Sequence, residues 1–266
     1  MPRVLITGTS SGLGRGVAQG LLERGWDVLG TVRDTAKSAA VPFETVALDV
    51  TDEDAVSLLG RQILSRWGRL DALVNNAGHL INGPVEELRA EELLRQLDVN
   101  IVGAASLTRA MLPALRAGRG VVVQVSSVAG QIGYPLFGAY NASKFGLEGL
   151  TEALAEEVAA QGVRVVLVEP SEFRTDISSK GAYVADRGAS GVYTEQWREQ
   201  DEWTDWMRSD SAPDPVACID AIVGAVVRED APMRIAVGDG TAGAVREHAR
   251  EVIAQMDASE AFLRSL

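Results

Sequence analysis

The stretch Thr7-Gly8-Thr9-Ser10-Ser11-Gly12-Leu13-Gly14 joins a short apolar run, Arg3 to Thr7, to a segment with apolar residues at helical spacing. Glycines in such a turn allow positive φ angles and let backbone N–H groups approach a phosphate. The first turn of the next helix adds unpaired donors and a positive dipole end. The pattern predicts a strand, a phosphate-binding turn and a helix. The expected cofactor contacts here are Gly8, Ser10, Ser11, Gly12, Leu13 and Gly14.

The rest of the chain repeats this alternation of strand and helix. Further strands are predicted over Val28 to Val32, Phe43 to Leu48, Leu70 to Val74, Val121 to Val125, Val163 to Val168 and Met233 to Val237. Later helices are predicted from Thr51, with Asp54 as its capping-box partner, over Ala90 to Leu115, Tyr140 to Ala160, Asp214 to Val227 and Thr241 to Met256. Repeated β-α-β units imply right-handed crossovers and a parallel sheet covered on both faces. We therefore expect an α/β, Rossmann-type doubly wound fold.

Length and charge limit the organisation and the partners. With 266 residues, 46% of them hydrophobic, we expect one domain over 1–266 that has a substantial core. A formal net charge of −12 makes nucleic acid and anionic membranes unfavourable partners. No apolar run is long enough to span a membrane, and the N-terminus lacks a signal-peptide pattern. The single cysteine, Cys218, excludes an internal disulfide and is typical of a cytoplasmic protein.

The end of the second strand is where a dinucleotide-binding sheet reads the adenosine ribose, about 20 residues after the glycines. There the chain reads Thr31-Val32-Arg33-Asp34. Asp34 could accept a hydrogen bond from a ribose 2′-hydroxyl, whereas Arg33 could pair with a 2′-phosphate. Arg33 could also be a surface arginine that pairs with Asp34. We favour NADP over NAD, with Arg33 as the anchor and the hydroxyls of Ser10 or Ser11 assisting.

Tyr140 and Lys144 are spaced to lie on one face of a helix, one turn apart. A tyrosine, with a reference pKa of about 10, is a poor base near neutral pH. A neighbouring ammonium stabilises the phenolate and is expected to lower that pKa. Only three lysines occur in this arginine-rich chain, which favours a specific need for an ammonium at 144. Ser127 follows the fifth strand, thirteen residues before Tyr140, where its hydroxyl could polarise a substrate oxygen.

Together these motifs resemble the short-chain dehydrogenase/reductase family. The resemblance rests on Thr-Gly-x-x-x-Gly-x-Gly, Asn75-Asn76-Ala77-Gly78, the Ser127-to-Tyr140 spacing and Tyr-x-x-x-Lys, and it covers about Arg3 to Asp176. It implies hydride transfer between a nicotinamide cofactor and a ketone, aldehyde or alcohol. The glycine spacing is that of the compact branch, which disfavours an epimerase or dehydratase. A non-catalytic NADP-binding sensor is a further alternative, but it would not need the whole chemical set.

The resemblance also implies roles for single residues. Tyr140 would be the proton donor and acceptor, Lys144 would lower its pKa and hold the nicotinamide ribose, and Asn100 would hold a water in the proton relay. Thr175 would bind the nicotinamide carboxamide. Further cofactor contacts are expected at Asp49, Val50, Asn76, Ala77, Gly78 and Pro170. The family usually has Pro-Gly where this chain has Pro170-Ser171, so we expect added bulk beside the nicotinamide.

Residues 176–213 interrupt the alternation and hold three of the five tryptophans. We expect a substrate lid within the domain, folded partly as short helices, and a bulky apolar substrate. Alternatively, these aromatic residues pack only against the domain. His79 could line the pocket rim or be structural, and His248 is expected at the surface. Two histidines and one cysteine argue against a transition-metal site.

A homo-oligomer is expected, with a dimer favoured over a tetramer. The helices around Asn100 and Tyr140 resemble those that form dimer interfaces in the family. The helix beyond Val237 could cover a second interface.

Overall fold

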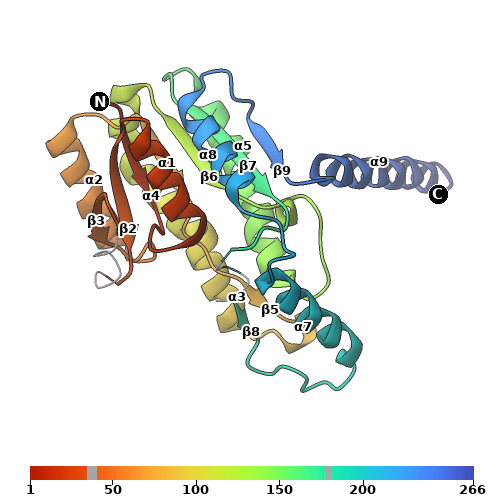
Figure 1. The fold of residues 1–266 in the computed structure, drawn as a ribbon. Coiled ribbons are helices and arrows are strands. Elements are labelled where there is room, and N and C mark those ends of the chain that lie inside the picture. Colours follow the sequence, from red (N-terminus) through yellow and green to blue (C-terminus); the bar gives the residue numbers. More distant parts are fainter. Residues whose placement is uncertain (35–40, 176, 178–180) are drawn as a thin grey trace.

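The computed structural model describes residues 1–34, 41–175, 177 and 181–266. A seven-stranded parallel sheet runs through its centre in the order β3-β2-β1-β4-β6-β7-β9 (Figure 1). The strands are β1 (Arg3–Ile6), β2 (Asp27–Val32), β3 (Glu44–Ala47), β4 (Ala72–Asn75), β6 (Val121–Val125), β7 (Arg164–Pro170) and β9 (Arg234–Val237). All seven strands occur where the sequence predicted them, and their ends differ by at most two residues. The predicted Rossmann-type α/β fold is confirmed.

Helices cover both faces of the sheet because its strands bury side chains on both sides. On one face, α1 (Gly12–Glu23) and α8 (Val216–Val227) pack Leu21 and Ile222 against the strands. On the other face lie α2 (Glu53–Trp67), α4 (Ala104–Gly118) and α5 (Gly138–Ala159). The sheet and its two helical layers thus fix the carboxyl ends of the strands, where the site lies.

Three helix predictions need correction. The cap of α2 is Asp52, whose side chain accepts from Ala55 N at 2.9 Å, and not Thr51 with Asp54. The predicted helix from Ala90 to Leu115 is divided into α3 (Ala90–Leu97), a π-helical segment (Asp98–Gly103) and α4. The last helix, α9 (Thr241–Arg264), extends beyond Met256 and projects from the body (Figure 1).

The predicted lid, of which residues 177 and 181–213 are described, contains one helix of 15 residues and a short strand, where short helices were expected. Its first residue, Asp176, lies outside the described residues. Strand β8 (Ala182–Tyr183) pairs with β5 (Ile81–Asn82), and α7 (Thr194–Arg208) follows beside them (Figure 1). The aromatic residues divide between two environments. Trp197 is 5% exposed and packs with Tyr183 against Ile81, whereas Trp203 lines the cavity described below.

Glu87 ties this lid to the rest of the protein. It lies in a short 3₁₀ helix (Val85–Glu87) and is 4% exposed. Its carboxylate accepts hydrogen bonds from Gly188 N at 2.8 Å, Ser190 N at 3.1 Å, Ser190 Oγ at 2.6 Å and Trp197 Nε1 at 3.1 Å. These contacts hold the pKa of Glu87 below its usual range, the Ser190 hydroxyl contributing most. The ionised carboxylate is therefore the form that the folded lid requires.

Replacing Glu87 with alanine should loosen the lid, because four donors lose their shared acceptor. We expect Glu87→Ala to lower the melting temperature by about 5 °C and to shift Trp197 emission toward that of a solvated indole. The control is Glu86→Ala, since Glu86 is exposed and, among the described residues, accepts one hydrogen bond, from the Tyr193 hydroxyl at 2.9 Å. Thermal unfolding followed by fluorescence checks this, and equal melting temperatures for the two variants would contradict it.

Candidate active site

The glycine turn between β1 and α1 leaves space for a ligand to approach the backbone. Gly8 and Gly12 have positive φ angles, +73° and +56°, which favour glycine. A Cβ on Gly14 would lie 2.4 Å from Asn76 Nδ2 and 2.5 Å from Gly8 O, so no side chain fits there. The turn opens at the N-terminus of α1, where donors and dipole favour an anion. This cradle fits the diphosphate of a nicotinamide dinucleotide.

Asn76 and Thr7 lock this turn to the end of β4. The Asn76 amide donates to Thr7 O at 2.8 Å, and Thr7 Oγ1 accepts from Asn76 N at 2.9 Å and Ala77 N at 2.8 Å. Asn75, its neighbour, instead points into the core and donates to Thr108 Oγ1 at 2.9 Å. The two asparagines thus have different tasks, and only Asn76 lines the cavity.

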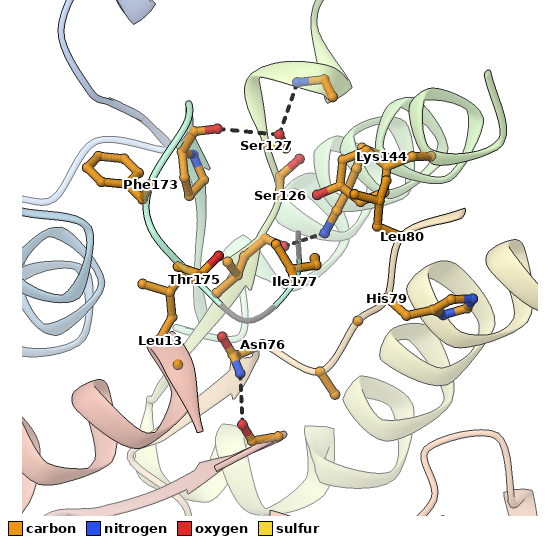
Figure 2. A pocket seen from close by; sticks show the side chains of 18 of the residues that line it. Leu13, Asn76, His79, Leu80, Ser126, Ser127, Lys144, Phe173, Thr175 and Ile177 are labelled. Carbon is orange, nitrogen blue, oxygen red and sulfur yellow. Dashed lines mark hydrogen bonds between the residues drawn. The ribbon is translucent and has the colours of Figure 1, made fainter. Parts of the chain in front are cut away.

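Ser127, Tyr140 and Lys144 meet at the carboxyl end of β6. Ser127 begins a 3₁₀ turn, where its hydroxyl accepts from Ala129 N at 3.2 Å and faces Pro170 O at 3.4 Å (Figure 2). The Ser127 hydroxyl also lies close enough to the Tyr140 hydroxyl to lower its pKa. Lys144 lies one turn further along α5 and donates from Nζ to Val125 O at 2.8 Å. The structure therefore brings together the three side chains that the sequence singled out.

Burial dominates the proton affinities of this group. It raises the pKa of Tyr140 to about 12, and the Ser127 hydroxyl opposes this only in part. Burial also lowers the pKa of Lys144 to about 8, while the negative charge of Glu148 opposes that change. The expected lowering of the Tyr140 pKa is not what the structure gives. Lys144 Nζ bonds to a backbone carbonyl and lies 5.6 Å from the Tyr140 ring centroid, so burial outweighs its charge.

Asn100 lies in the π-helical segment and not on a regular helix. It is 2% exposed, and its amide donates to His79 O at 3.1 Å and Ser143 Oγ at 3.0 Å. Its carbonyl oxygen accepts from His79 N at 3.1 Å. The π segment turns Asn100 toward α5 and the strand end, as such segments do at functional sites. Asn100 itself does not line the cavity, and neither does Gly14.

A cavity of about 1550 Å³ joins the glycine turn to the Tyr140 group. Figure 2 shows Ser127 and Lys144 across it from Leu13 and Asn76. The predicted residues that line it are Gly8, Ser10, Ser11, Gly12, Leu13, Arg33, Asp49, Val50, Asn76, Ala77, Gly78, Ser127, Tyr140, Lys144, Pro170 and Thr175. One continuous space therefore contacts nearly all of the predicted site.

Arg33 lines the end of the cavity beside β2, together with Asp34 and Asp49. The charge of Arg33 helps to lower the pKa of Asp49, although hydrogen bonds from Thr51 contribute more. His79 is half-buried, and burial first, then the charges of Arg95 and Arg33, lower its pKa. His79 is therefore neutral at physiological pH. Arg95 was not predicted, because it is 62 residues from Arg33 in sequence and only the fold brings both to one cavity.

Ser171, which stands where the family usually has glycine, has its side chain against the next strand. A Cβ on Gly238 would lie 1.9 Å from Ser171 Oγ, and Gly238 has a φ of +119°. The space for the serine is thus provided by a glycine after β9. The Ser171 hydroxyl therefore points toward Gly238, so it adds less bulk beside the nicotinamide than expected. Ser171 still contributes to the cavity wall.

Comparisons with known proteins agree with this geometry. The family model described as short chain dehydrogenase matches residues 2–182, more than half of the chain. The 3-ketodihydrosphingosine reductase of Bacteroides thetaiotaomicron is 42% identical over 173 residues, which cover 65% of this chain and 64% of that enzyme. An NADPH-dependent 3-dehydrocapnine reductase of Ornithobacterium rhinotracheale is 33% identical over 237 residues, 84% of this chain and 82% of that one. A short-chain dehydrogenase structure from Streptomyces avermitilis superimposes with a TM-score of 0.85 at 35% identity, and the match covers 99% of this chain and 98% of the other.

The chain belongs to the short-chain dehydrogenase/reductase family. This dehydrogenase/reductase is an NAD(P)-dependent oxidoreductase that interconverts a carbonyl compound and an alcohol. Within the described ranges, no three His, Cys, Asp or Glu side chains form a group that could hold a metal ion. Across that same part of the chain, no helix is both long and apolar enough to cross a membrane.

Proposed function

We propose that Tyr140 is the general acid/base, that Ser127 binds the reacting oxygen and that Lys144 stabilises the phenolate. The observation that carries this is that Ser127, Tyr140 and Lys144 lie together on the wall of the cavity of about 1550 Å³ that begins at the glycine turn. With a pKa of about 12, Tyr140 holds its proton at neutral pH and is poised to donate it to a substrate oxygen. Asn100 would hold a water behind the group and act as a positioning residue.

The cofactor would lie along the cavity from the glycine turn to Tyr140. Ser10, Ser11, Gly12 and Leu13 would hold its diphosphate, and Asp49, Val50 and Asn76 to Gly78 would surround the adenosine. Pro170 and Thr175 would contact the nicotinamide, and Lys144 its ribose. When bound, the cofactor supplies or accepts the hydride.

NADP is the preferred cofactor in this proposal. Arg33 supports it, since a guanidinium matches phosphate oxygens, and Arg95 adds positive charge along the same cavity. The relative from Ornithobacterium rhinotracheale, named as NADPH-dependent, is consistent with the preference. Asp34 also lines the cavity, and it could accept a hydrogen bond from the ribose 2′-hydroxyl of NAD. This contact would compete with the pairing of Arg33 and a 2′-phosphate.

Arg33→Gln should weaken NADPH binding by about tenfold or more and leave NADH binding nearly unchanged, because it removes a charge that only the 2′-phosphate uses. Asp34→Asn is the matched variant and should change neither affinity strongly. Fluorescence titration with both cofactors measures this. Loss of NADH affinity in Asp34→Asn, with NADPH unaffected by Arg33→Gln, would instead assign NAD as the cofactor.

We propose a bulky, mainly apolar substrate that contacts the lid. The cavity extends from Tyr140 to α7, and Leu80, Leu136, Ile177, Trp203 and Met207 form apolar parts of its wall. The cofactor would occupy the part from the glycine turn to Tyr140, and the apolar part beyond Tyr140 suits an apolar ligand group. A cytoplasmic location is proposed with this function, supported by the lone Cys218.

Tyr140→Phe should bind NADPH as the wild type does and lose about 10² to 10⁴-fold in turnover, since only the acid/base hydroxyl is removed. The control is Tyr183→Phe, because the Tyr183 hydroxyl contacts Asp201 and Thr204 in the lid, away from the cavity. NADPH oxidation on a graded panel of ketones and aldehydes is the measurement. Near-normal turnover by Tyr140→Phe would refute the assigned chemistry.

We propose a homodimer, in preference to a tetramer, through the projecting helix α9. Apolar residues recur along one side of α9, and the residues from 249 onward are exposed. Antiparallel contact of two copies would cover Val252, Ile253 and Met256. It would also set Arg246 opposite Glu260 of the partner subunit and Arg250 opposite Asp257 of the partner subunit. This charge complementarity favours self-association, which buries the same patch on both copies.

Ile253→Glu combined with Met256→Glu should convert the dimer to a monomer, since four carboxylates would then meet at the pairing axis. The matched control is Val102→Glu with Phe145→Glu, which charges exposed apolar residues near Asn100 and on α5. Size-exclusion chromatography with light scattering gives the mass. A dimer that resists the first pair and dissociates with the second would place the interface on the helices around Asn100 and Tyr140, and a monomeric wild type would refute the dimer.

A further inference from the structure

The charged residues that line the cavity differ between its two ends. At the cofactor end its charged lining residues are Arg33 and Arg95 together with Asp34, Asp49 and Asp98, so positive and negative groups are mixed there. At the lid end, between the end of β7 and α7, the charged side chains among the described residues are Glu172 and Glu199. Lys144 lies between the two ends, where it belongs to the Tyr140 group. Because opposite charges attract across a confined space, the two carboxylates at the lid end favour a cationic ligand group.

Glu172 is part of an aromatic wall at this lid end. Trp203 Nε1 donates to Glu172 Oε1 at 2.7 Å, and the Trp203 ring meets Phe137 edge-on with 5.5 Å between centroids. Tyr134 belongs to the same wall, since burial first and the negative charge of Glu172 second raise its pKa. One carboxylate and three aromatic rings thus border one space. The second carboxylate oxygen of Glu172 remains able to accept further hydrogen bonds.

We propose that this wall binds a protonated amine, so the substrate is a ketone, or its alcohol, that carries an ammonium group and an apolar chain. The proposal rests on the proposed carbonyl–alcohol function and names the substrate class for the same cavity. Glu172 supplies the counter-charge, and the faces of Trp203, Phe137 and Tyr134 attract a cation through their quadrupoles. Glu199 adds a second negative charge along the wall.

The position of Glu172 connects this amine site to the chemistry. Glu172 is two residues beyond Pro170, whose carbonyl faces Ser127 Oγ at 3.4 Å. The ammonium would therefore be bound from the same strand end that helps to fix the reacting oxygen. The apolar chain has Leu80, Leu136 and Met207 available on the cavity wall. A substrate carboxylate at the lid end would meet Glu172 and be disfavoured.

Glu172→Gln separates the charge from the structural role of this residue. A glutamine still offers an oxygen to Trp203 Nε1, so the wall should keep its shape while its negative charge is lost. Glu202→Gln is the matched control, because Glu202 lies on the same helix as Trp203 but pairs with Arg198 and does not line the cavity. NADPH consumption is compared for a medium-chain amino ketone and for the same ketone with methyl in place of ammonium.

We expect the wild type and Glu202→Gln to favour the amino ketone in kcat/KM by about tenfold or more, mainly through KM. Glu172→Gln should lose that preference, so that its kcat/KM values for the two ketones become nearly equal. Equal kcat/KM for both ketones in the wild type would overturn the amine site, and so would a Glu172→Gln variant that slows both ketones equally, since it would show a structural role alone.

If no ketone is turned over, the proposed function fails, but the amine site can still be tested by a binding measurement. Calorimetry on the protein saturated with NADP⁺ would compare octylammonium, octanol and octanoate. Tightest binding of octylammonium, reduced about tenfold by Glu172→Gln and unchanged by Glu202→Gln, supports the amine site. Octanol or octanoate binding as tightly as octylammonium overturns it.

Discussion

The site depends on the hydrogen bonds that tie Thr7 at the end of β1 to Asn76 at the end of β4. These two strands lie side by side in the sheet, and the chain leaves them in opposite directions, so their carboxyl ends form the switch point at which such sheets bind ligands. Asn76 donates two hydrogen bonds to Thr7. Its backbone N–H bonds to Thr7 Oγ1 at 2.9 Å, and its side-chain amide bonds to Thr7 O at 2.8 Å. The glycine turn is then held open above α1, and it cannot accommodate a Cβ at Gly14.

A second constraint lies behind Lys144, in a buried charge network. Glu148 and Glu169 are 4% and 2% exposed, and both contact Arg234 from β9. Burial raises the pKa of Glu148, and the charge of Glu148 in turn opposes the loss of a proton from Lys144. The charge of Glu148 therefore favours the ammonium form of Lys144 and offsets part of the effect of burial. The last strand of the sheet thus supports the electrostatics of a group on α5.

The sequence predicted those features that depend on local pattern. Strands such as β6 are apolar runs between turns, and the Tyr140–Lys144 spacing fixes a shared helix face. The π segment around Asn100 was missed because one wider turn leaves the apolar spacing nearly unchanged. Strands β5 and β8 are two residues long, too short for any periodicity. The contact between Glu172 and Trp203 spans 31 residues, and only the placement of α7 across the cavity creates it.

Ser171 shows how a departure from a family pattern can be compensated at a distance. A glycine at this position would leave room beside the strand end, whereas the serine hydroxyl occupies the space that a side chain at 238 would need. Gly238, with φ +119°, leaves that space open and lets the chain turn from β9 toward α9. Asp239, Gly240 and Thr241 in this turn also line the cavity. The turn from Gly238 to Thr241 therefore belongs both to the cavity wall and to the start of α9. A partner that packs on α9 and a ligand that binds in the cavity would both contact elements joined by this turn.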